Sequence, residues 1–138
     1  MRIGLVLLTL LLAGCSDPVA PDPAIVRIEI TRLDRIETGQ WLAVFSITNV
    51  GTEAAFLPRC DEVLTGLEQW TGSEWRRVPI EACIAIRAQD RIVLEPGAVV
   101  SGERVIPPAG RYRLHVRYSH NAGAELERIV ATDPMDTE

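Results

Sequence analysis

A side-chain period of two runs through most of the sequence beyond residue 24. Between residues 112 and 118 every second residue is apolar, and the residues between them are Arg, His and Arg. Residues 26–30 alternate in the same way, whereas residues 41–48 are apolar on both sides for much of their length. A period of two belongs to a β-strand and a period of 3.6 to an α-helix. The pattern therefore predicts half-buried strands at 26–30 and 112–118 and a central strand at 41–48.

Turn signals divide the rest of the chain into further short strands. Gly-containing turns are expected at 49–52, 71–73, 95–97 and 121–123, and no segment has the pattern of an amphipathic helix. Consecutive strands without crossover helices favour an antiparallel two-layer sandwich. We expect one all-β domain of seven to nine strands over residues 24–133, with a small closed barrel as the alternative, and a disordered tail over residues 134–138.

Three short patterns resemble those of bacterial immunoglobulin-like domains. Phe45–Thr52 is similar to a strand that ends in an Asn-x-Gly turn, and Gly110–Leu114 resembles a Gly-x-Tyr strand start in which the Tyr hydroxyl bonds to loop backbone. Leu94–Gly97 resembles an aliphatic-x-Pro-Gly turn. Their order and spacing are similar to those of the intracellular proteinase inhibitor (BsuPI-like) family. The resemblance implies an immunoglobulin-like β-sandwich, and it carries no reactive-site residue over to this sequence.

The amino terminus has the features of an export signal. Arg2 precedes the apolar run Ile3–Leu12, which is too short for a bilayer span of about 20 residues. The run ends in Leu12-Ala13-Gly14-Cys15, which resembles the bacterial lipobox. This resemblance implies a signal peptide over residues 1–14, a lipid on Cys15, and a flexible Pro-rich tether over residues 15–23. Ser16 after the cysteine implies the outer membrane, facing the periplasm, where the source has two membranes.

Two further cysteines, Cys60 and Cys83, remain once Cys15 carries lipid. Export places them in an oxidising compartment, so a disulfide is the expected state. Two buried thiols or half of a metal site are the alternatives. A zinc site needs two more ligands, and the sequence offers only His115 and His120 as histidines. We predict no metal and no cofactor.

Composition and motifs narrow the functional classes. The formal net charge is −5, and nucleic-acid binding favours basic surfaces. No Gly-x-Ser-x-Gly or phosphate-binding motif occurs, and His115 and His120 are expected on the surface without a catalytic partner. We expect a non-catalytic binding or scaffolding domain of the cell envelope, held to the membrane through Cys15 and partnered by an envelope protein or a glycan. An exported protease inhibitor and a hydrolase with an unrecognised site are the alternatives.

Two groups of residues are candidates for a binding surface. Trp70 and Trp75 flank the turn at 71–73, where they either stack on a ligand or cap the end of the core. Arg113 and Arg117, with Arg111 and with Arg104 or Arg128 on a neighbouring strand, form a cationic stripe. The alternative is that the stripe is neutralised across strands by Glu103, Glu125 and Glu127.

Overall fold

The computed structural model describes residues 25–60, 62–63, 65–79 and 91–138, and these residues form an all-β domain without a helix. The predicted signal peptide, Cys15, the tether and Cys83 lie outside the described residues. The described residues form eleven strands, two more than the upper limit of the prediction. The sequence does not predict β4 and β11, because they are only two and three residues long. The strands are β1 (Val26–Arg35), β2 (Trp41–Asn49), β3 (Ala55–Cys60), β4 (Glu62–Val63), β5 (Gly66–Trp70), β6 (Trp75–Val78), β7 (Arg91–Leu94), β8 (Val99–Ile106), β9 (Gly110–Tyr118), β10 (Arg128–Ala131) and β11 (Met135–Thr137).

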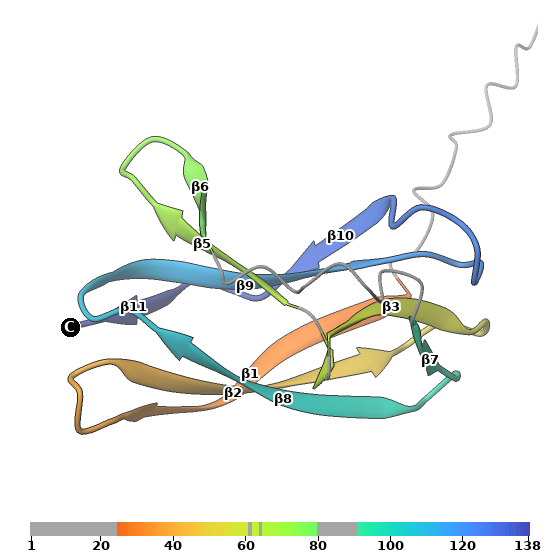
Figure 1. Ribbon diagram of the computed structural model, residues 1–138, viewed down its shortest axis with the longest axis horizontal. Coiled ribbons are helices and arrows are strands. Elements are labelled where there is room, and N and C mark those ends of the chain that lie inside the picture. The colour runs from red at the N-terminus through yellow and green to blue at the C-terminus, as the bar shows by residue number, and fades with distance from the viewer. Residues whose placement is uncertain (1–24, 61, 64, 80–90) are drawn as a thin grey trace, which may run out of the picture.

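The strands form a small antiparallel β-sandwich. One layer is the sheet β1-β2-β8, and the other has the order β10-β9-β5-β6, with β11 beside the beginning of β9. A small sheet β4-β3-β7 closes one end, where a bridge between Phe56 and Ser119 joins β3 to the strand line of β9. Figure 1 shows the two layers and the β5–β6 hairpin, which projects away from the sandwich.

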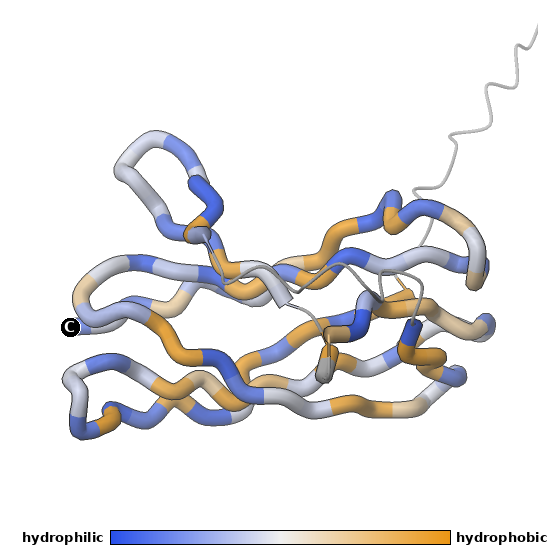
Figure 2. The backbone as a smooth tube through the Cα atoms, in the orientation of Figure 1, coloured by the Kyte–Doolittle hydropathy of each residue, from blue (hydrophilic) through white to orange (hydrophobic). Residues whose placement is uncertain are grey.

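The core lies between the central strands of the two layers. Phe45 and Ile47 of β2 and Leu114 and Val116 of β9 are at most 1% exposed. Hydrophobic and hydrophilic residues alternate along β9 (Figure 2), as the period of two predicts, whereas β2 is apolar on both sides for much of its length. The described residues contain no helix that could span a membrane.

Asn49 explains why the Asn-x-Gly pattern stands at the end of β2. Its side chain is buried, and its amide nitrogen donates hydrogen bonds of 2.7 Å to the carbonyl oxygens of Glu53 and Leu94. Its side-chain oxygen accepts a 2.9 Å bond from the backbone N–H of Gly51. A buried amide with its partners in place holds loop backbone in one geometry. Asn49 therefore joins the turn after β2 to the turn after β7.

The Gly-x-Tyr pattern is explained only in part. The ring of Tyr112 is buried and lies against Gly110, where a Cβ atom would come within 2.7 Å of the ring. The hydroxyl of Tyr112 makes no hydrogen bond among the described residues, so the bond to loop backbone that the resemblance implies is not found there.

The prediction of a disordered tail over residues 134–138 is wrong. Met135–Thr137 forms β11, which pairs with Tyr112–Gly110 of β9. Met135 and Thr137 are buried, and Asp136 between them points outward to Arg111. Three residues are too few for their alternation to be recognised in a sequence, so the strand becomes visible only beside its partner.

Candidate binding site

The four residues predicted to bind a partner lie on one side of the sheet β10-β9-β5-β6. Residues directly opposite each other in paired strands point to the same side. The register pairs Trp70 with Trp75, Glu68 with Arg77 and with Arg113, and Gly66 with His115. We call this side the outer face. On β5, β6 and β9 it comprises Gly66, Glu68, Trp70, Trp75, Arg77, Arg111, Arg113, His115 and Arg117, and on β10 and β11 it continues with Ile129, Ala131 and Asp136.

Trp70 and Trp75 form an aromatic pair on the projecting hairpin. Their ring centroids are 5.4 Å apart, with an angle of 54° between the ring planes. Trp70 is 36% exposed and Trp75 is half-buried, and neither belongs to the core. Of the two interpretations of this pair, the structure therefore supports a surface position and not a cap on the core.

Arg113 connects the tryptophan pair to the body of the sheet. Its guanidinium carbon lies 4.4 Å from the centre of the Trp75 ring, a cation–π geometry. Its Nε donates a hydrogen bond of 2.7 Å to a carboxylate oxygen of Glu68, and both side chains are less than one-third exposed. The side chains of Trp75, Arg113 and Glu68 therefore hold one another in place.

The cationic stripe differs in detail from its prediction. Arg111 and Arg113 are paired with Asp136, at 3.8 Å, and with Glu68, not with Glu103, Glu125 or Glu127. Arg104 lies on β8 in the other sheet, and Arg128 is in register with buried Tyr118, so neither joins the outer face. Among the described residues, Arg77 and Arg117 make no ion pair.

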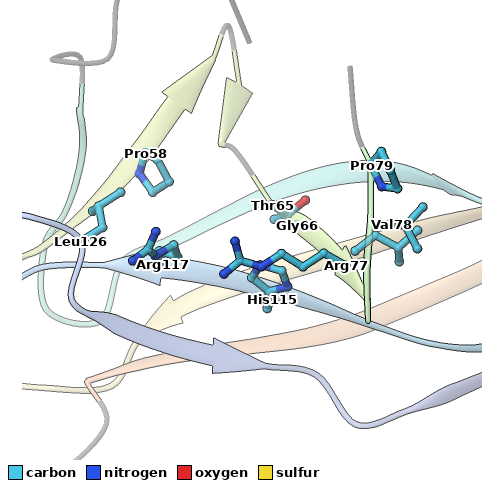
Figure 3. Close-up of a pocket in the computed structure, with 10 residues that line it drawn as sticks. Pro58, Thr65, Gly66, Arg77, Val78, Pro79, His115, Arg117 and Leu126 are labelled. Atoms are coloured by element: carbon cyan, nitrogen blue, oxygen red, sulfur yellow. The ribbon is translucent and has the colours of Figure 1, made fainter. Parts of the chain in front are cut away.

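A cavity of about 390 Å³ opens beside Arg77 and Arg117. It lies where β5 ends its pairing with β9 at His115 and β3 approaches β9 at Ser119. Pro58 and Pro79, which border the gap, have no N–H with which to continue a sheet. The lining residues are Pro58, Thr65, Gly66, Leu67, Arg77, Val78, Pro79, His115, Arg117 and Leu126 (Figure 3).

His115 is not the solvated surface histidine that the strand pattern predicts. Only 6% of the residue is exposed, because its ring lies directly on the backbone of Gly66 in the neighbouring strand. A Cβ atom on residue 66 would collide with the imidazole. The sequence signal for this contact is a glycine where β5 begins, but its meaning depends on the pairing of β5 with β9.

The environment of His115 favours the neutral imidazole. Burial is the main cause that lowers its pKa, and the charges of Arg77, Arg113 and Arg117 lower the pKa further, against the opposite effect of Glu68. The Nδ1 atom is buried and has no hydrogen-bond partner. Figure 3 shows the guanidinium of Arg77 extending over this ring, with Arg117 farther along β9.

The other candidate residues do not join this cavity. His120 lies beyond the end of β9, where its ring meets that of Tyr118 at a centroid distance of 6.1 Å. The described lining contains His115 but no carboxylate, so it lacks the His–carboxylate pair that the hydrolase hypothesis requires. No group of three metal-ligating side chains occurs within the described ranges.

The comparisons with known proteins leave the function open. No protein-family model matches the sequence, and no curated protein matches it significantly. Among solved structures, the archaellum periplasmic stator protein FlaG from Sulfolobus acidocaldarius is similar at 11% identity and a TM-score of 0.37. The match covers 78% of this chain and 95% of that chain. A likeness at this level carries no argument about function.

The predicted disulfide is only partly within view. Cys60 is the last residue of β3, and Cys83 lies outside the described residues. The pairing of these two cysteines therefore stays a prediction.

Proposed function

We propose that this protein is a lipid-anchored protein of the cell envelope whose β-sandwich binds a partner through its outer face, without catalysis. The observation that carries the proposal is that Trp70, Trp75, Arg113 and Arg117 share one side of one sheet. These residues come from three strands, and Trp75 contacts both Trp70 and Arg113. Side chains presented by a sheet are held in place by its packing, as a binding surface requires.

The chemistry of the outer face suits a protein or a glycan. Tryptophan and arginine are the side chains that most often dominate binding energy at protein interfaces, and tryptophan rings also stack on sugars. Arg113 is already ordered by Trp75 and Glu68. Binding therefore loses little side-chain entropy at this position.

The anchor is tested with the full chain expressed in a bacterial host. Mass spectrometry of the purified protein should show an amino terminus at Cys15 with added acyl mass. The Cys15→Ser variant should leave the membrane fraction. Retention of Met1 without acyl mass would contradict the anchor, and with it the proposed location in the outer membrane facing the periplasm.

The binding surface is tested by cross-linking the full lipidated protein in native membranes. The double variant Trp70→Ala with Trp75→Ala should lose its cross-linked partner and keep its thermal midpoint within a few degrees. The matched control is Val99→Ala with Val105→Ala, which removes exposed apolar side chains from β8 in the other sheet. Digestion with glycosidases or proteases then identifies the partner as a glycan or a protein. An unchanged cross-link in the tryptophan variant would overturn the proposal.

If the double variant fails to fold, the single variant Trp70→Ala keeps the test decisive. Trp70 is the more exposed ring of the pair, and Arg113 packs on Trp75 and not on Trp70. The single variant should weaken the cross-link and fold normally.

One observation favours the exported protease inhibitor as a second candidate. The β5–β6 hairpin projects from the sandwich (Figure 1) and belongs to the segment between Cys60 and Cys83. A projecting hairpin has the shape needed to enter an enzyme cleft. The test is a panel of serine, cysteine and metalloproteases, in which inhibition at micromolar concentration supports this candidate and its absence removes it.

A further inference from the structure

The cavity beside His115 combines apolar walls with two arginines that make no ion pair among the described residues. The protein as a whole is acidic, with a net charge of −5. On the outer face, Arg111 and Arg113 are neutralised by carboxylates, whereas Arg77 and Arg117 make no ion pair among the described residues. Both unpaired guanidinium groups belong to residues that line the cavity.

The lining of the cavity includes a histidine that can bond to a ligand. His115 is 94% buried, since its exposed fraction is 6%. Its Nδ1 has no hydrogen-bond partner. The Nδ1 atom is enclosed, whereas the other ring nitrogen, Nε2, is not enclosed and has no hydrogen-bond partner among the described residues. A ligand in the cavity can therefore bond to Nε2, because a neutral imidazole both donates and accepts a hydrogen bond.

We propose that this cavity binds an organic carboxylate carried on a small apolar group. The guanidinium groups of Arg77 and Arg117 pair with the carboxylate, and Nε2 of His115 makes a hydrogen bond to the ligand. Pro58, Val78 and Leu126 contact the hydrocarbon part. This inference rests on the proposed binding function, because it gives the ligand chemistry for one part of the outer face.

The charge and the size of the cavity select this class of ligand. Guanidinium groups bind carboxylates and phosphates through paired N–H donors. The apolar side chains that make up half of the lining favour an acid with a hydrocarbon part over inorganic phosphate. A volume of about 390 Å³ is near the lower end of the range of ligand pockets, roughly 300–1,000 Å³, and it suits a ligand of the size of an acylated amino acid.

The experiment is a titration of the full lipidated chain in detergent micelles, followed by the NMR signals of the His115 ring. The probes are N-acetyl-L-leucine, its uncharged amide and inorganic phosphate. N-acetyl-L-leucine should give saturable shifts of the His115 signals, and the other two probes should bind at least about ten-fold more weakly. Equal binding of the acid and the amide would overturn the proposal.

Substitutions locate the carboxylate. The variant Arg77→Gln with Arg117→Gln should weaken the binding of N-acetyl-L-leucine by about ten-fold or more. The matched control Arg76→Gln with Arg111→Gln removes the same charge from the same two strands. Arg76 lies opposite Gln69 on the other side of the sheet, and Arg111 is paired with Asp136 away from the cavity lining. Equal losses in the two variants would mean that only net charge matters, which overturns the site.

The same variants separate this inference from the proposed function. If N-acetyl-L-leucine does not bind while Trp70→Ala with Trp75→Ala still abolishes the cross-link, only the cavity site is wrong. If N-acetyl-L-leucine binds and the tryptophan variant keeps its cross-link, the cavity site stands and the tryptophan surface is wrong.

A tripeptide that ends in leucine shows whether the carboxylate of the natural ligand belongs to a peptide end or to a free small acid. Tighter binding than that of N-acetyl-L-leucine supports the site with a peptide end as its ligand, and weaker binding supports the site with a free small acid.

Discussion

The two sides of β9 differ in how evenly their side chains are buried, although they belong to one strand. Tyr112, Leu114, Val116 and Tyr118 face the core and are at most 2% exposed. The outward side chains range from exposed Arg117 through half-buried Arg113 to buried His115. The inner side is thus uniform, because every position meets the same core. The outer side varies because each position meets a different neighbour.

The neighbours on the outer side come from the strand next to β9. His115 is covered by the cavity walls and lies on Gly66, and Arg113 is held by Glu68 and Trp75. Arg117 lies beyond Gly66, the first residue of β5, and has no such partner among the described residues. The inner side is therefore expected to determine stability, and the outer side binding.

The largest effect is expected from Leu114→Ala on the inner side. Leu114 is fully buried, so its truncation leaves a cavity and should lower the free energy of unfolding by roughly 3–5 kcal/mol. Urea denaturation followed by tryptophan fluorescence measures the change. A loss below about 1 kcal/mol would show that the two layers do not pack as described.

Gly66→Ala should have an intermediate effect. The added methyl group collides with the imidazole of His115, and crowding of this kind costs about 1–3 kcal/mol of unfolding free energy. The His115 ring should move toward solvent, so its NMR signals should approach those of a free histidine. Gly123→Ala is the control, because a Cβ atom there meets nothing within 4 Å. Unchanged His115 signals in Gly66→Ala would contradict the contact between the two strands.

The stability of the wild-type protein should fall between pH 7 and pH 5, in part because of His115. Burial lowers the pKa of this residue below its ordinary value, so the unfolded chain binds a proton more readily than the folded one. Stability is therefore full above the unfolded pKa of about 6.5 and is lost as the pH falls toward the folded pKa. Thermal midpoints at both pH values should show a smaller decline in His115→Gln than in the wild type. An equal decline in the two proteins would place the acid sensitivity elsewhere.

The smallest effect on stability is expected from Arg117→Gln. Arg117 is exposed and makes no ion pair among the described residues, so the free energy of unfolding should change by no more than about 0.5 kcal/mol. The same substitution should weaken the binding of N-acetyl-L-leucine several-fold. Loss of stability without loss of binding would reverse the roles that we assign to the two sides of β9.

The sequence predicts the inner side of β9 and not the outer side, for a physical reason. Alternation shows which side chains point away from the core, and it predicts the strand at 112–118 and the buried residues within it. It does not show what covers the outward side chains. The burial of His115 depends on Gly66, and the proximity of Arg77 depends on the β5–β6 hairpin. Register between distant strands is a tertiary property that local patterns do not contain.

The same reason applies to the cavity. Pro58, Arg77, His115 and Leu126 come from distant parts of the chain, and only the assembled sheets bring them together. The sequence predicts the tryptophan pair because its two residues flank one turn. Asn49 was singled out by a short motif, whereas its bond to the carbonyl oxygen of Leu94 required the fold.

The most direct test of the account is the pKa of His115, measured by NMR with and without saturating N-acetyl-L-leucine. Without ligand, the pKa should lie below the ordinary value, because of burial and of the charges of Arg77, Arg113 and Arg117, which outweigh that of Glu68. With ligand, the carboxylate offsets those positive charges, so the pKa should rise, and binding should tighten as the pH falls. An ordinary pKa that does not respond to the ligand would contradict both the burial of His115 and the carboxylate site above it.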